Sequence, residues 1–149
     1  MKKFFIISLV ITVFYGFPLW SQPLNPIQLH GRWQLKYRGN YGYMFHFYKN
    51  FRALCVIYLN HSAVVFKGIY TVEADNTLRI NIYEMKNSSS SGINYHSNFV
   101  KTTSTYLLFN AERTVEGSSH LLLIKPKKIM IDGRSSDGYF EPMIKLKKY

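Results

Sequence analysis

Apolar and polar residues alternate along most of the chain from residue 31 onward. In the stretch 31–38, Trp33, Leu35 and Tyr37 fall on one face of an extended chain, and Arg, Gln and Lys residues occupy the other face. A period of two is typical of a β-strand with one buried face. Since no segment shows the 3.6-residue period of an amphipathic helix, the pattern predicts an all-β protein.

The same alternation recurs in further runs, which are separated by short turn signals such as Gly39-Asn40 and Asp75-Asn76. Short connections of this kind join neighbouring antiparallel strands. The pattern predicts about eight short strands in a single antiparallel up-and-down β-barrel, with a β-sandwich as the alternative. The barrel is favoured because closure removes the exposed edges of a sheet, and Gly68 in mid-strand suits the bend that a small barrel needs. The expected strands cover residues 31–38, 41–49, 52–59, 62–73, 77–85, 103–113, 118–126, 127–132 and 139–149, the run 127–132 being either separate or a continuation past Pro126.

Residues 1–21 have the layout of a secretory signal peptide. Lys2 and Lys3 precede an apolar stretch of about 12 residues, and Ser21 offers a small residue before the expected cleavage. The apolar stretch is shorter than the roughly 20 residues of a membrane-spanning helix, which disfavours an uncleaved anchor. We expect export to the periplasm, the outer envelope or the extracellular space, a spacer over residues 22–30, and one barrel domain over residues 31–149.

The charge balance is basic. The chain has 19 Lys and Arg residues against 8 Asp and Glu residues, and loss of Lys2 and Lys3 with the leader lowers the net charge from +11 to +9. Such a balance favours an anionic partner, although it also keeps a β-rich protein soluble. An exported protein seldom meets nucleic acid, so we expect no nucleic acid among the partners. Cys55 is the sole cysteine, so the core must stabilise the fold without an internal disulfide.

Three stretches resemble a known family: Gly31-x-Trp33 at the head of the first strand, the run FKGIYTVEADNTLRINI, and the ending IKLKKY. Together they resemble the lipocalins and the lipocalin-like (calycin-type) domains of bacterial secreted proteins. The resemblance implies an eight-stranded barrel whose closed end is plugged by Trp33, with a basic side chain of the last strand over the ring. Lys145 or Lys147 would take that place, because the closing arginine of the family is absent. A cation over an indole ring contributes about 0.5–2 kcal/mol.

The sequence carries none of the common motifs of enzyme chemistry. The five histidines form no H-x-H or H-x-x-x-H pair, and Cys55 has no C-x-x-C partner, so we expect no metal site and no cofactor. Cys55 lies in an apolar strand, whereas an activated thiol needs a cation-rich, partly exposed setting. The sequence also lacks a G-x-S-x-G elbow and a phosphate-binding loop. We therefore expect no catalytic residue and no enzymatic activity.

Aromatic residues supply the candidate binding chemistry. The chain has 12 tyrosines and 11 phenylalanines, and rings on the inner face either line a pocket for a guest or fill the barrel. Glu84 shares the parity of Ile80 and Ile82. That parity directs it into the barrel, where it would hold the polar head of a ligand or act with Lys67. The candidates for the cavity wall are Tyr43, Phe45, Phe47, Phe66, Tyr70, Glu84 and Phe109.

Three functions remain open, of which the first two have more support. The first is an exported lipocalin-like barrel that binds a small hydrophobic or amphipathic ligand in the cell envelope. The serine-rich stretch 86–98 would then be a mobile loop or a lid at the barrel mouth. The second is a non-catalytic interaction module with a packed core, whose basic C-terminal face binds an anionic membrane surface or a partner protein. An enzyme or inhibitor on the same barrel is a third possibility.

Overall fold

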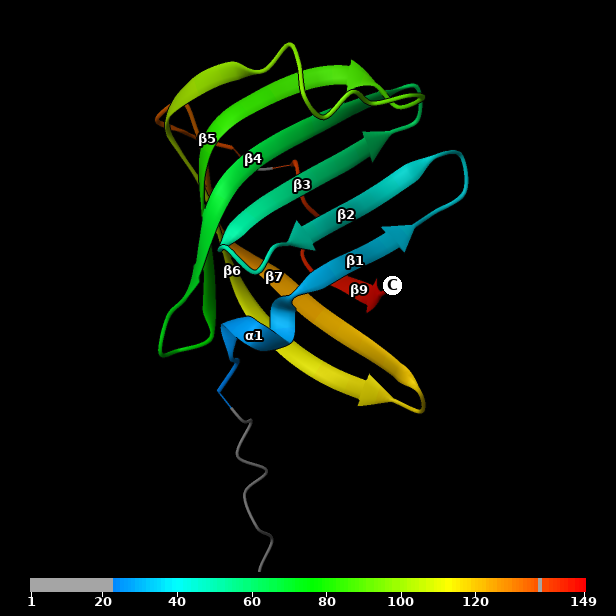
Figure 1. Ribbon diagram of the computed structural model, residues 1–149, viewed down its shortest axis with the longest axis vertical. Helices are drawn as coiled ribbons and strands as arrows, with labels where there is room; N and C mark the ends of the chain where they lie inside the picture. Colours follow the sequence, from blue (N-terminus) through cyan, green and yellow to red (C-terminus); the bar gives the residue numbers. More distant parts are fainter. Residues whose placement is uncertain (1–22, 137) are drawn as a thin grey trace, which may run out of the picture.

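The computed structural model describes residues 23–136 and 138–149, and the signal peptide expected over residues 1–21 lies outside them. The described residues form one short helix and nine strands (Figure 1). The elements are α1 (Pro26–Leu29), β1 (Gly31–Lys36), β2 (Tyr41–Phe47), β3 (Arg52–Leu59), β4 (Ser62–Val72), β5 (Thr77–Ser89), β6 (Val100–Glu116), β7 (Ser119–Ile131), β8 (Arg134–Ser135) and β9 (Ile144–Lys148).

Eight of these strands close into an antiparallel barrel. Strands β1 to β7 pair in sequence order, and β9 lies between β7 and β1, which completes the ring (Figure 1). The two-residue strand β8 is an additional strand that pairs with the end of β7. Consecutive hairpins need no long crossover, and the closed ring leaves no free edge among its eight strands. The predicted all-β class and the predicted eight-stranded barrel are confirmed.

Two strand boundaries near the C-terminus differ from the expected ones. The runs 118–126 and 127–132 form one strand, β7, which continues past Pro126. The β6–β7 register shifts between Leu108 and Phe109, opposite this proline, and a bulge is where a sheet tolerates a residue without an N–H group. The last strand begins only at Ile144, because Pro142 interrupts the run that starts at residue 139. Residues 138–143 are irregular, and we call them the return segment.

The interior of the barrel holds the main hydrophobic core, which we call the inner core. The alternating apolar residues of every long strand point into it, as the period-two pattern predicts. Its largest side chains, such as Trp33, Phe66 and Leu122, are completely buried. Burial of apolar surface on this scale is the dominant favourable contribution to folding. The interior of the barrel is therefore one contiguous core, and the sole cysteine leaves the chain without an internal disulfide.

A β-bulge in β5 reverses the alternation halfway along the strand. Lys67 pairs with Glu84 and the next residue, Gly68, pairs with Ile82, so that Tyr83 is an extra residue opposite β4. A Cβ atom on Gly68 would lie 2.5 Å from the backbone oxygen of Asn81, which only glycine avoids. Since the extra residue shifts the parity, Glu84 lies on the outer face and not inside the barrel, contrary to the expectation from its spacing to Ile80 and Ile82.

A second hydrophobic cluster lies outside the barrel, and we call it the outer cluster. Apolar residues on the outer face of β2 to β4, among them Met44, Val56 and Val65, are buried there. They are covered by Ile93, Tyr95 and Phe99 from residues 90–99, the connection between β5 and β6, which we call the covering loop. The serine-rich stretch therefore starts as the end of β5 and then packs against the side of the barrel.

Candidate functional site

Six of the seven residues predicted to line a cavity lie together inside the barrel. Tyr43, Phe45, Phe47, Phe66, Tyr70 and Phe109 are each 7% exposed or less. Four of these rings pack on one another: the ring centroids of Phe45 and Phe109 are 5.9 Å apart, edge to face, and those of Phe47 and Tyr70 are 4.9 Å apart. Edge-to-face packing of this kind is favourable beyond the area that it buries. The four rings, of Phe45, Phe47, Tyr70 and Phe109, thus form a continuous aromatic layer, since the Phe45 and Phe47 rings also stack on each other.

The return segment adds further rings to this layer. The Phe140 ring lies 5.1 Å from that of Phe109 and 5.8 Å from that of Tyr43, and the Tyr139 ring lies 6.3 Å from that of Phe66. Polar contacts hold the segment in place. The Glu141 N–H donates to the Tyr43 hydroxyl at 3.2 Å, and the Tyr37 hydroxyl donates to the Glu141 carboxylate at 2.8 Å. The chain's own aromatic side chains therefore occupy the space between the predicted wall residues.

The closing motif at the other end of the barrel contains Gly31 and Trp33, as expected, but the cation over the ring is Lys148. The Lys148 Nζ atom lies 5.2 Å from the ring centroid of Trp33. Lys148 shares the inward parity of Ile144 and Leu146, whereas Lys145 and Lys147 point outward and are exposed. Alternation along β9 therefore excludes Lys145 and Lys147 from this place. Burial, and next the charge of Arg113, lower the pKa of Lys148.

The segment before β1 contributes to the same closed end. Leu24 and Leu29 are buried in the inner core, and the indole Nε1–H of Trp33 donates to the backbone oxygen of Leu29 at 2.6 Å. Asn25 caps α1, since its side chain accepts from the backbone N–H of Ile27. The region expected as a spacer thus packs across the base of the barrel and satisfies the one polar atom of Trp33.

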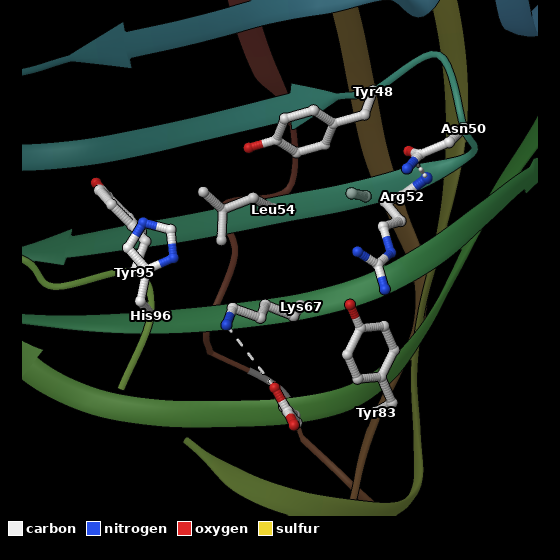
Figure 2. A pocket seen from close by; sticks show the side chains of 10 residues that line it. Tyr48, Asn50, Arg52, Leu54, Lys67, Tyr83, Tyr95 and His96 are labelled. Atoms are coloured by element: carbon white, nitrogen blue, oxygen red, sulfur yellow. Dashed lines mark hydrogen bonds and ion pairs between the residues drawn. The ribbon is translucent and has the colours of Figure 1, made fainter. Parts of the chain in front are cut away.

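The outer face carries a pocket of about 430 Å³, which sequence reasoning did not anticipate. Figure 2 shows its side chains around a common space, with Tyr95 and His96 of the covering loop toward one end and Tyr83 toward the other. The remaining lining residues come from the end of β2, the β2–β3 turn and strands β3 to β5: Tyr48, Asn50, Arg52, Ala53, Leu54, Lys67 and Glu84.

A second pocket of about 430 Å³ continues the first toward β1. The two share Tyr48, Leu54, Tyr95 and His96, so we treat them as one site, the outer groove. The second pocket adds side chains from β1 to β3: Arg32, Gln34, Lys36, Met44, His46 and Tyr58.

Strand register explains why these residues line up. Arg32 is paired with His46, His46 with Leu54, Leu54 with Lys67, and Lys67 with Glu84. These pairs form one straight row across five strands. In an antiparallel sheet, paired residues point to the same face, so the row forms a continuous floor from β1 to β5.

The electrostatics of the outer groove favour a negatively charged ligand. Arg32, Lys36, Arg52 and Lys67 line it, against a single carboxylate, Glu84. Lys67 Nζ lies 3.8 Å from the Glu84 carboxylate, and both side chains are partly exposed. This one ion pair leaves an excess of positive charge along the groove, which attracts anions.

Aromatic rings line the middle of the groove, and the titratable groups among them favour their neutral forms. The His46 and Tyr48 rings stack with centroids 4.0 Å apart. Burial and the neighbouring charge of Arg32 lower the pKa of His46, which favours its neutral form. Burial, and next the contact with Tyr95, raise the pKa of Tyr58 to about 12. These groups therefore offer rings and neutral hydrogen-bonding atoms to a ligand.

Lys86 fixes the covering loop that borders the groove. It is 7% exposed and donates from Nζ to the backbone oxygen of Ser97 at 3.0 Å and to that of Asn94. Its ammonium group also lies 4.7 Å from the ring centroid of Phe99, and the Lys67 ammonium lies 3.6 Å from the same centroid. Phe99 thus receives two cations, and the loop is held by charge as well as by apolar packing.

Within the described residues, no three His, Cys, Asp or Glu side chains come close enough to hold a metal ion. Cys55 is buried in the inner core, and burial raises the pKa of its thiol. A thiol in this setting is not an activated nucleophile. In the same part of the chain, no helix has the length and apolar character to span a membrane.

Sequence reasoning placed the inward rings correctly but missed the outer groove. Its residues are the polar positions of each strand, which look like an ordinary solvent-facing surface when each strand is read alone. The available signal was the clustering of Arg, Lys, His and Tyr at outward positions of successive strands, such as Arg32 and His46.

Comparison with known proteins matched the chain to no family model, to no curated protein and to no solved structure. The closed eight-stranded antiparallel barrel is compatible with a lipocalin-like fold.

Proposed function

We propose that this protein is a non-catalytic binding protein with a lipocalin-like barrel, and that its ligand lies outside the barrel, in the outer groove. The ligand is a small amphipathic molecule with negative charge. The observation that supports this proposal is the groove itself, which is hollow and rich in cations. Among the described residues, three of these cations, Arg32, Lys36 and Arg52, have no ion-pair partner.

A ligand inside the barrel, the first function expected from the sequence, has weaker support. The rings that would line its cavity pack on one another and on Phe140, so a guest would have to displace the return segment. The packed core instead fits the second function, an interaction module. We propose the outer groove as the site of its anionic partner, in place of the basic C-terminal face expected from the sequence.

The groove suits an amphipathic anion chemically. The guanidinium of Arg52 can donate two parallel hydrogen bonds to a carboxylate, phosphate or sulfonate. A ring of the ligand would lie on Leu54 and beside Tyr48, which borders both pockets. Pockets that combine an apolar surface with a few fixed polar groups orient such ligands.

We test this with a pair of fluorescent probes that differ in charge, anilinonaphthalene sulfonate and the uncharged phenylnaphthylamine. We expect the sulfonate to bind more tightly and its affinity to fall as salt is added. Arg52→Ala should weaken sulfonate binding about tenfold, the value of one charged hydrogen-bonding partner. Lys125→Ala removes an exposed cation of β7 outside the groove and serves as the control. Equal binding of both probes, unchanged by Arg52→Ala, would exclude the outer groove as the site.

Export is part of the proposal. The leader-like residues 1–21 and the resemblance to lipocalin-like domains of bacterial secreted proteins support a location in the periplasm, the outer envelope or outside the cell. N-terminal sequencing of the protein isolated from cells tests it. We expect a mature chain that starts at Gln22, and a chain that still starts at Met1 would contradict cleavage.

A further inference from the structure

The outer groove is longer than a compact small molecule needs. Its floor crosses β1 to β5 along the row of paired residues from Arg32 to Glu84. Neighbouring strands lie about 4.8 Å apart, so four strand spacings extend about 19 Å along the curved sheet. The two pockets merge in the middle, at Tyr48 and Leu54. The shape therefore suits an elongated ligand that fills both pockets at once.

The cations stand in two groups along this length. Arg32 and Lys36 belong to β1, whereas Arg52 and Lys67 belong to β3 and β4. Arg32 and Lys67 lie in the same row three strands apart, about 14 Å at the usual strand spacing. A ligand that uses both groups must carry at least two separate negative charges.

The uncharged side chains that line the groove narrow the chemistry further. The exposed rings of Tyr48 and Tyr83, 39% and 36% accessible, offer flat faces to the C–H face of a sugar ring. Asn50, Gln34 and the tyrosine hydroxyls offer donors and acceptors to ring hydroxyls. The apolar floor is restricted to a few residues such as Leu54, which is too little for a long acyl chain. A single-stranded nucleic acid is also a linear polyanion, and its binding is one of the outcomes that the test below distinguishes.

We propose that the outer groove binds a linear acidic oligosaccharide, whose carboxylates or sulfates contact the two cation groups and whose sugar rings lie against the tyrosines. This deepens the proposed function and rests on it, because it names the ligand class of the same groove. A sugar ring has an apolar C–H face and a polar edge, so the ligand is amphipathic.

The test is calorimetric titration with galacturonate oligomers of increasing length, at low and at moderate salt. If both cation groups are used, affinity should rise about tenfold or more between the dimer and the hexamer, because the second contact becomes intramolecular. Arg32→Ala and Arg52→Ala should each remove most of this gain with length, because either change weakens one of the two cation groups that the hexamer needs. Lys125→Ala is the control, and a neutral glucose hexamer should not bind.

The outcomes separate this inference from the proposed function. If the galacturonate hexamer binds no better than the dimer, while the sulfonate probe still binds in an Arg52-dependent manner, the oligosaccharide is excluded and the groove remains an anion site. If an oligothymidylate of similar length binds more tightly than the hexamer, the ligand class is wrong. If neither the hexamer nor the sulfonate probe binds, both proposals fail.

Discussion

The inner and outer faces of the barrel are built from the same strands but differ in how many of their side chains have partners within the chain. On the inner face, the aromatic side chains find their partners within the chain, and Phe140 from the return segment completes the layer. On the outer face of β1 to β5, four cations face one carboxylate across a hollow surface. The side chains of the inner face therefore pack on one another, whereas the outer face carries cations that have no ion-pair partner among the described residues.

This difference indicates which face of a small barrel is available to bind a ligand. An eight-stranded barrel is narrow enough to be filled by its own side chains, so aromatic richness alone does not indicate a cavity. Polar residues on the outer face do not have to fill the interior, so they can contact a ligand. Where a loop such as residues 90–99 covers part of that face, the remaining part becomes a groove with a wall.

The largest expected effect concerns the inner core. Trp33→Ala removes a completely buried ring and its hydrogen bond to Leu29, and we expect a loss of about 3–5 kcal/mol in the free energy of unfolding, measured with denaturant. Tyr83→Ala, in the outer groove, is the matched control and should change stability by about 0.5 kcal/mol or less. Similar losses in the two variants would remove the contrast between a packed inside and an open outside.

The return segment is the next test of the same contrast. Phe140→Ala should lower the free energy of unfolding by about 2 kcal/mol. A fully buried Phe would lose about 3–5 kcal/mol, but Phe140 is partly exposed. The variant should also gain binding of the uncharged phenylnaphthylamine, since it vacates space among the inner rings. Met143→Ala, an exposed neighbour in the segment, is the control. If Phe140→Ala leaves stability and dye binding unchanged, the segment does not fill the interior.

Lys86 tests whether the covering loop is a structural wall of the groove. Lys86→Met keeps most of the side-chain length but leaves the backbone oxygens of Asn94 and Ser97 without this donor. We expect a loss of about 1–2 kcal/mol and faster hydrogen exchange of the backbone amides in residues 90–99. Lys125→Met is the control. Unchanged exchange would mean that apolar packing alone holds the loop.

The last test concerns the pH dependence of the outer cluster, an effect that is absent at neutral pH and appears only above pH 10.0. Since folding raises the pKa of Tyr58 to about 12 from its ordinary value of 10.0, the unfolded chain loses this proton first as the pH rises. The contribution of Tyr58 to stability is therefore complete below pH 10.0 and is lost toward pH 12. Tyr58→Phe should therefore unfold at a higher pH than the wild type. The measurement is an alkaline titration in which tyrosinate absorbance reports unfolding, and Tyr149→Phe is the control. Identical transitions in the wild type and Tyr58→Phe would contradict the buried hydroxyl.

Alternation predicted the barrel because an error of one residue would turn every apolar side chain to solvent. It placed Phe45, Phe47 and Phe109 inside. The role of Trp33 as a plug was implied by the resemblance to the lipocalins, and the ring is completely buried. Alternation misplaced Glu84, because an extra residue in a bulge leaves the local composition unchanged while it reverses the parity beyond it. Gly68 was the one visible sign of that irregularity.

The remaining features depend on contacts between distant segments. Lys148 is the exception, because its shared parity with the apolar Ile144 and Leu146 was already visible in the sequence. The covering loop is serine-rich and looks solvated, yet Tyr95 and Phe99 carry enough apolar surface to attach it to the barrel. The outer groove arises from the register of five strands, and register is a property of pairs of strands that no single strand contains.

The buried thiol of Cys55 has a practical consequence. It is the sole cysteine, it lies at the middle of β3, and burial raises its pKa. Only the thiolate reacts with disulfide reagents in solution, so modification occurs only in molecules whose strands have parted. The labelling rate of the unmodified wild-type chain therefore reports how often the barrel opens. A comparison of the labelling rate with and without a ligand in the outer groove would show how strongly ligand binding on the outer face stabilises the barrel against opening.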